Sequence, residues 1–370
     1  MATALASEQL HAIANQALEH WSLQVTSLTL ASQSENTVFR IETADRGTFA
    51  LRLHRPGYHS LPELESEQIW TRALAEGGIA IPKVELTKHG RYYVEAGLGT
   101  PATTRQAGLI QWLPGEALSE VLANQPSDSL LHDTYFALGT LIARCHLATL
   151  AWTAPARFTR HALDHDGFVG DAPFWGRFWE LGLTTQSNRD QLKLIRTAVS
   201  AHLRSIPKNP QNFGMIHADL HANNVLRNAD QLYVIDFDDA GFGWHAFDLA
   251  VAVYDQLDFF HSTPRFDITS KALIAGYDSV RPGCNDSFAQ LPLFLLVRSL
   301  MLLKWIEDRP EVGRENNIPM LLEIAFEQFK NLQAYLALAS PRETARLYKS
   351  NFAMATRVTH STFINFGGSL

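Results

Sequence analysis

The chain has little cysteine and no excess of positive charge. Of its 370 residues only Cys145 and Cys284 are cysteines, and they lie far apart without a paired Cys or His spacing. This argues against a disulfide framework or a structural zinc site and predicts a cytoplasmic location in a reducing compartment. The formal net charge is −7 and the basic residues are scattered, so we expect no nucleic-acid partner.

Long apolar runs and an export signal are also missing. The longest apolar stretch, LPLFLLVRSLMLLKW, is interrupted by Arg298 and Lys304, so we interpret it as a buried helix and expect no membrane association. The first residues predict an amphipathic helix with Ser7 as its cap, without the basic region and unbroken apolar core of a signal peptide. With 370 residues, 46% of them hydrophobic, the chain is long and apolar enough to form two lobes, each with a hydrophobic core.

Strand patterns dominate the first third of the chain. The segments LQVTSLTL, NTVFRIET and TFALRLHR alternate in polarity and are separated by turn residues, which predicts antiparallel strands. A helical pattern with Leu64, Ile69 and Leu74 on one face follows and should end at Gly77. Strand character then returns up to QWLPG. We therefore predict a first lobe over residues 1–112, with the order β-β-β-α-β-β-β after its N-terminal helix.

Residues 113–370 have a mainly helical texture and are predicted to form the second lobe. Helical periods recur from about residue 130 onward, including 186–206, 245–257, 268–279, 286–308 and 313–338. The one strand-like interruption lies within 215–250. The predicted fold class is therefore α+β, with the strands and most of the helices in separate lobes.

Polar side chains are concentrated in that interruption. HADLHANN places His217, Asp219 and Asn224 at the spacing H-x-D-x(4)-N, and the apolar run in LYVIDFDD ends at Asp236. Phosphoryl transfer needs an aspartate that orients the attacking hydroxyl, and oxygen ligands that hold magnesium against the nucleotide phosphates. Hard cations prefer such a set of Asp and Asn side chains. The stretch thus indicates phosphoryl transfer.

This stretch resembles the catalytic and metal-binding loops of the aminoglycoside phosphotransferase family, which includes choline/ethanolamine kinase, homoserine kinase and stress response kinase A relatives. Three upstream segments, SENTVFRIETADRGTFALRLHRPG, ELESEQIWTRALAEGGIAIPKV and QWLPGEAL, look like the family's first strands, its N-lobe helix and its hinge, in that order. The resemblance extends over roughly residues 30–310. It implies a bilobed protein-kinase-like fold, with an antiparallel-sheet N-lobe and a mainly helical C-lobe, that uses ATP and Mg.

The resemblance also implies roles for the polar residues. Asp219 corresponds to the catalytic aspartate, Asn224 to a magnesium ligand and Asp236 to the main magnesium ligand. Asp238 belongs to DFDD, where relatives of the protein kinases have D-F-G, and is a candidate for a further metal or substrate contact. Asp248 corresponds to an aspartate that fixes the catalytic loop by accepting backbone N–H groups.

On the nucleotide side, the resemblance places Arg52 where the family more often has the lysine that holds the phosphates. Arginine retains the charge but differs from lysine in geometry. Its ion-pair partner would be Glu67, with Glu65 as second choice.

The remaining nucleotide contacts expected from the resemblance come from a turn and a hinge. Ser34 and Asn36 lie where a turn should cover the phosphates, although no G-x-G-x-x-G is present. Gln111 through Leu113 should line the adenine pocket with their backbone groups.

Other functions stay open at this point. His217, Asp219 and His221 share a face of a strand and could form a transition-metal cluster of a hydrolase. A nucleotide-binding pseudokinase is a second alternative. The acceptor could be a small molecule of amino-alcohol, amino-acid or aminoglycoside type, or a Ser/Thr side chain of a protein, as in the stress response kinase type. The sequence does not choose between ATP and GTP, and it leaves the oligomeric state unknown.

Overall fold

The computed structural model describes residues 5–33, 36–124, 126–259 and 264–338. Its N-terminal part is a six-stranded sheet in the order β1-β2-β3-β6-β4, in which β5 also pairs with β6, and all pairs are antiparallel. The strands are β1 (Val25–Gln33), β2 (Thr37–Thr43), β3 (Gly47–Leu53), β4 (Val84–Glu85), β5 (Tyr93–Ala96) and β6 (Arg105–Gln111). The predicted succession along the chain, of three strands, a helix and three further strands, is confirmed. Because β6 ends at Gln111, we keep the proposed division of the chain at residue 112.

Helix α1 (Ser7–Leu18) packs on this sheet and closes a small core of its own. Its Leu10 and Ile13 are buried together with Phe39 and Leu51 of the strands. The prediction that Ser7 caps this helix is wrong. Ser7 is instead the first helical residue, Ala6 is the N-cap, and the Ala6 N–H donates to the side chain of Gln9 at 3.0 Å.

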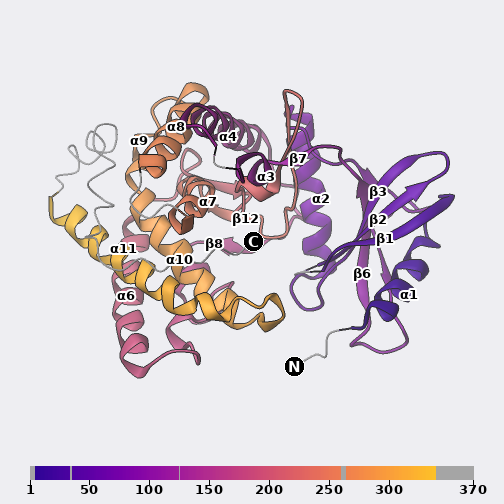
Figure 1. Cartoon of the computed structure of the whole chain (residues 1–370), viewed down its shortest axis with the longest axis horizontal. Helices are drawn as coiled ribbons and strands as arrows, with labels where there is room; N and C mark the ends of the chain where they lie inside the picture. The colour runs from indigo at the N-terminus through magenta and orange to yellow at the C-terminus, as the bar shows by residue number, and fades with distance from the viewer. Residues whose placement is uncertain (1–4, 34–35, 125, 260–263, 339–370) are drawn as a thin grey trace.

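Helix α2 (Leu61–Glu76) connects the sheet with the rest of the molecule (Figure 1). It begins with a capping box, in which the Ser60 N–H donates to Glu63 Oε2 at 2.8 Å, and it ends at Gly77 as predicted. Its buried Trp70 belongs to the large core of the helical part and donates a hydrogen bond from Nε1 to Thr149 Oγ1 at 3.1 Å. The helix is therefore anchored to both parts.

The second part is mainly helical, as predicted. Its main helices are α3 (Leu118–Leu122), α4 (Asp128–Ala151), α5 (His165–Val169), α6 (Gln186–Ser205), α7 (His245–Phe259), α8 (Pro264–Val280), α9 (Asn285–Ala289), α10 (Leu291–Glu307) and α11 (Ile318–Leu338). The single helix predicted over 286–308 is in fact α9 and α10, with a break at Gln290. Pro292 explains the break, because proline is tolerated in the first turn of a helix but not in its interior. Within the residues that the structure describes, no helix has the length and apolar character to span a membrane.

Two small sheets complete this part and carry the polar stretch. The first has the order β11-β10-β7 and the second β8-β12-β9. Their strands are β7 (Glu116–Ala117), β8 (Ala162–Leu163), β9 (Phe213–Ile216), β10 (Val225–Asn228), β11 (Gln231–Val234) and β12 (Gly241–Trp244). The loops between β9 and β12 hold the residues expected to do chemistry.

Helices α4 and α8 touch backbone to backbone through two glycines. A Cβ atom added at Gly139 would lie 2.0 Å from the carbonyl oxygen of Leu273, and one added at Gly276 would lie 2.0 Å from that of Phe136. Both positions are therefore closed to any side chain. This close approach sets the position of α4, which carries His146 to the base of the site described below.

We predict that Gly139→Ala destabilises the protein by about 2 kcal/mol or more, because the new methyl group must push α4 away from α8. Urea unfolding followed by circular dichroism measures the free energy of unfolding. Gly182→Ala is the matched control, since its Cβ would meet only Glu307 Oε1, at 3.6 Å. Equal unfolding midpoints for the two variants would contradict the packing described here.

Candidate active site

A single carboxylate, that of Asp248, binds the backbone of the loop after β9. Asp248, in the first turn of α7, accepts hydrogen bonds from the backbone N–H groups of His217 at 3.1 Å and Ala218 at 2.6 Å. Ala218 has a φ of 66°, a left-handed conformation that is unfavourable for alanine. The two bonds to Asp248 help to hold this conformation, which turns the chain toward Asp219.

His217 uses both of its ring nitrogens within the protein. Its Nδ1 accepts from the Asp219 N–H at 3.3 Å, and its Nε2–H donates to the carbonyl oxygen of Ile235 at 3.1 Å. His217 is thus a positioning group between the two polar loops. No cluster of three or more His, Cys, Asp or Glu side chains suited to a metal ion occurs in the described part of the chain. With both ring nitrogens already paired, His217 has none left for the metal ion of the hydrolase alternative.

The structure brings Asp219, Asn224 and Asp236 together. The Asn224 Nδ2 group donates to Asp219 Oδ2 at 2.9 Å and to the Asp219 carbonyl oxygen at 2.8 Å. These bonds leave the amide oxygen of Asn224 for another partner. Because the Ile235 N–H donates to the carbonyl oxygen of Asn224 at 3.0 Å, Asp236 follows directly beside it in a left-handed conformation, with φ 61°. The side chain of Asp236 is 50% exposed.

Arg52 of β3 reaches this group from the sheet. Its Nη2 lies 2.8 Å from Asp236 Oδ1 and 3.0 Å from Asp238 Oδ1, and its Nη1 lies 3.8 Å from Glu67 Oε1. Of the two expected candidates, Glu67 is the one near Arg52, although Asp236 and Asp238 lie closer to it, whereas Glu65 is exposed. Burial, assisted by the negative charge of Asp238, raises the pKa of Glu67 to about 7.

Asp238 connects the metal-loop segment, residues 236–240, to the sheet. Its Oδ2 accepts a hydrogen bond from Asn36 Nδ2, its Oδ1 pairs with Arg52, and His54 Nδ1 lies 3.8 Å from the same oxygen. Burial alone would raise its pKa, but the charges of Arg52, His54 and His59 and the hydrogen bond from Asn36 together lower the pKa to about 2. The carboxylate expected to contact a metal thus faces Asn36 and Arg52. Ser34, expected beside Asn36, lies outside the described residues.

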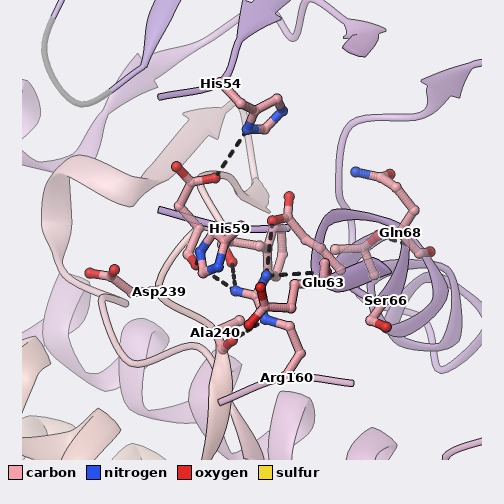
Figure 2. A network of polar contacts seen from close by, with 12 residues as sticks. His54, His59, Glu63, Ser66, Gln68, Arg160, Asp239 and Ala240 are labelled. Carbon is pink, nitrogen blue, oxygen red and sulfur yellow. Dashed lines mark hydrogen bonds and ion pairs between the residues drawn. The ribbon is translucent and has the colours of Figure 1, made fainter. Parts of the chain in front are cut away.

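Sequence reasoning missed Arg160, whose side chain is fully buried against the metal-loop segment. Its Nε donates to the carbonyl oxygen of Ala240 at 2.6 Å, and its Nη2 donates to those of Phe237, at 3.3 Å, and Asp238. Its Nη1 donates to the carbonyl oxygen of Glu63 at 3.3 Å (Figure 2). No motif in the surrounding loop signals this role, because every partner is distant in sequence.

Two histidines also donate hydrogen bonds to the backbone of the same segment. His59 donates from Nε2 to the carbonyl oxygen of Asp238 at 2.7 Å, and His161 donates from Nε2 to that of Asp239 at 3.1 Å. With Arg160, they pair all four carbonyl groups of residues 237–240 with side chains. In Figure 2 the side chains of His59 and Arg160 lie next to each other, where both donate to the carbonyl oxygen of Asp238.

The expected hinge follows the last strand of the large sheet. The Gln111 N–H donates to the carbonyl oxygen of Lys83 at 2.7 Å, and the Trp112 N–H donates to that of Thr48 at 3.0 Å. Leu113, the next residue, is half-buried. These bonds fix the backbone course of the hinge and leave the expected adenine contacts of Gln111 and Leu113 as a prediction.

A buried chain of hydrogen bonds supports Asp248. Arg281 Nη1 donates to the Tyr277 hydroxyl at 2.6 Å, this hydroxyl donates to His146 Nδ1 at 2.8 Å, and His146 Nε2–H donates to Asp248 Oδ2 at 3.0 Å. The ring of His245 stacks on that of His146, with their centroids 4.2 Å apart. This arrangement requires neutral imidazoles, since a second cation beside Arg281 would be repelled.

Comparison with known proteins agrees with this geometry. The family described as the phosphotransferase enzyme family matches residues 27–282. The chain belongs to this family. The resemblance to aminoglycoside phosphotransferases is therefore confirmed, and the protein is a kinase-type enzyme that acts on hydroxyl groups.

Relatives and solved structures support the same assignment. Homoserine kinase of Methylobacillus flagellatus is 27% identical over 73% of this chain and 76% of its own, and amicoumacin kinase of Bacillus subtilis is 25% identical over 61% and 62%. A solved microcompartment-associated aminopropanol kinase is 28% identical, with a TM-score of 0.69 over 93% of this chain and 94% of its own. The kinase-like fold of this phosphotransferase is thus confirmed.

In this phosphotransferase, we predict that Arg160→Met lowers the free energy of unfolding by about 3 kcal/mol or more. The change leaves buried carbonyl groups unpaired and removes a cation that lies 3.7 Å from Glu67 Oε2. Urea unfolding measures the effect. Arg72→Met, on the exposed side of α2, is the matched control and should cost less than about 0.5 kcal/mol. Similar urea midpoints for both variants would refute the stabilising role of the Arg160 hydrogen bonds.

We also predict that acid destabilises the phosphotransferase through its stacked histidines. Burial lowers the pKa values of His146 and His245 well below their usual range, and Arg281 adds to this effect. The unfolded chain binds protons near pH 6.5 but the folded protein does not, so the free energy of unfolding falls as the pH decreases below about 6.5. Urea midpoints between pH 7.5 and pH 5 measure this slope.

The pH experiment compares the same substitution, histidine to asparagine, at a buried and at an exposed position. His245→Asn should make the decrease in stability toward low pH shallower. His132→Asn, at a side chain that is 54% exposed, should leave it unchanged. An unaltered slope in His245→Asn would show that the stacked pair does not contribute to the acid sensitivity.

Proposed function

We propose that the protein transfers the γ-phosphoryl group of ATP to a hydroxyl of a small molecule of amino-alcohol, amino-acid or aminoglycoside type. Asp219 orients the hydroxyl and accepts its proton. The observation that carries the proposal is the convergence of Asp219, Asn224 and Asp236 from two loops joined by the Asn224–Ile235 backbone bond. The small-molecule names of the relatives, homoserine kinase and amicoumacin kinase, support the choice of acceptor.

The side chains fit a bound magnesium ion. The amide oxygen of Asn224 is left over by its two donated bonds, and the Asp236 carboxylate is half exposed, so two hard oxygen ligands are available in adjoining loops. When bound, the ion would neutralise charge on the nucleotide phosphates. An amicoumacin kinase was solved with AMP-PNP and Ca²⁺, which supports a nucleotide and a divalent ion here.

Arg52 and Asn36, which both belong to the sheet part, would contact the phosphates of the nucleotide. Arg52 already contacts the Asp236 carboxylate, so its guanidinium lies beside the position proposed for the metal and the phosphates. Glu67 forms an ion pair with Arg52, and Asp238 pairs with Arg52 and accepts a hydrogen bond from Asn36. We therefore propose that Asp238 shapes the phosphate site through these two residues, and that direct metal binding falls to Asn224 and Asp236.

The experiment is an ADP-release assay with Mg-ATP and a panel of aminoglycosides, choline, ethanolamine, homoserine and protein substrates. We predict that Asp219→Asn lowers kcat by about 1,000-fold or more while Mg-ATP still binds, because the amide cannot accept the proton. Asp236→Ala should instead weaken Mg-ATP binding, measured by calorimetry. Unchanged turnover in Asp219→Asn would refute the assigned role, and a protein kinase would phosphorylate only the protein substrates.

A further inference from the structure

Arg298 is a buried cation in the mainly apolar helix α10. It lies in the middle of α10, is only 8% exposed, and has the buried residues Val297 and Leu300 beside it. Burying a guanidinium among apolar side chains is costly unless the charge is paired and hydrogen-bonded. A leucine at this position would complete the apolar helix, so the arginine calls for a specific explanation.

Its partner is the proposed catalytic carboxylate. Arg298 Nη2 lies 2.6 Å from Asp219 Oδ1, whereas the other oxygen of Asp219, Oδ2, accepts the hydrogen bond from Asn224. The Asn224 side is the proposed metal side. A hydroxyl acceptor that donates to Asp219 therefore uses Oδ1, the oxygen that Arg298 faces.

A second cation also lies beside Asp219. His221 Nε2 lies 3.4 Å from Asp219 Oδ2, and its Nδ1 lies 2.8 Å from Asp255 Oδ2, so both ring nitrogens face carboxylates and the ring is positively charged. Asp219 is thus paired with both Arg298 and His221 before any acceptor binds. Arg298 Nε, in addition, is buried and has no hydrogen-bond partner among the described residues.

These contacts determine what can sit next to the reacting hydroxyl. A hydroxyl that donates to Asp219 Oδ1 brings its neighbouring atoms against the Arg298 guanidinium. A carboxylate there would gain a charge-assisted hydrogen bond and would keep Arg298 paired when the hydroxyl takes its place on Asp219. An ammonium group in the same place would be repelled. We propose that Arg298 selects acceptors that carry a carboxylate close to the hydroxyl, an inference that rests on the proposed transfer at Asp219.

The test compares acceptors that differ only in the carboxylate. Serine and ethanolamine, threonine and 1-amino-2-propanol, and homoserine and 3-amino-1-propanol are three such pairs. ADP release gives kcat/KM for each member, together with a panel of aminoglycosides and polyols. We expect the wild-type enzyme to prefer the acid of at least one pair by about 10- to 100-fold, the range of one charge-assisted hydrogen bond.

The variants separate recognition from positioning. In Arg298→Met the ratio of acid to amine should fall toward one, and Arg298→Lys should keep part of the preference because the charge remains. A loss of activity that is equal for both members of a pair would show that Arg298 only positions Asp219, and would overturn the proposal. If Arg298→Met does not fold, the wild-type ratios and Arg298→Lys still decide.

The remaining outcomes distinguish this inference from the proposed function. A wild-type enzyme that uses the amines as well as the acids, or that phosphorylates only aminoglycosides or polyols, would overturn the selection by Arg298 and leave phosphotransfer intact. If no hydroxyl compound is phosphorylated although Mg-ATP binds, the proposed function itself fails, and the inference fails with it.

Discussion

The structure depends on the compensation of clustered negative charge. Asp219, Asp236, Asp238 and Glu67 are gathered around one site, and carboxylates at such short range repel one another unless cations stand between them. Arg52 meets three of the four, at 2.8 Å, 3.0 Å and 3.8 Å. The remaining carboxylate, Asp219, is paired with Arg298, and Glu67 also lies near Arg160. The site can form only when the elements that carry these arginines have come together.

This requirement couples the sheet to the helical part. Asp238 is 186 positions from Arg52 in the chain, and Arg298 is 79 positions from Asp219. An arginine removed from its carboxylates would leave buried charge uncompensated, at a cost of about 3 kcal/mol or more. The contacts that prepare the phosphate site are therefore also contacts that hold the two parts in place, and α2 takes part because both Glu63 and Glu67 meet Arg160.

How much the sequence could predict follows from the distance between partners. Asp219, Asn224 and Asp236 lie within 18 positions of one another, in a stretch that resembles the family's catalytic and metal-binding loops, so the sequence predicted that they belong to one site. The succession of strands along the chain could also be predicted, because alternating polarity and turn residues are local signals. Arg160 carries no such signal, since its partners lie near residues 63 and 240. Arg298 did leave a trace, as a charge that interrupts an apolar helix, and that trace should be interpreted as a buried ion pair.

Two left-handed residues show how the site is held in its working shape. Ala218 and Asp236 both have positive φ values, a conformation that costs non-glycine residues of the order of 1 kcal/mol each. Each lies where surrounding hydrogen bonds determine the backbone: Asp248 fixes the first, while Asn224 binds the residue before the second. Asp248 in turn depends on His146, whose helix is positioned by the glycine contact with α8. The orientation of Asp219 is thus set by packing more than 25 residues away in sequence, so substitutions remote from the loop can reach the chemistry through this chain of contacts.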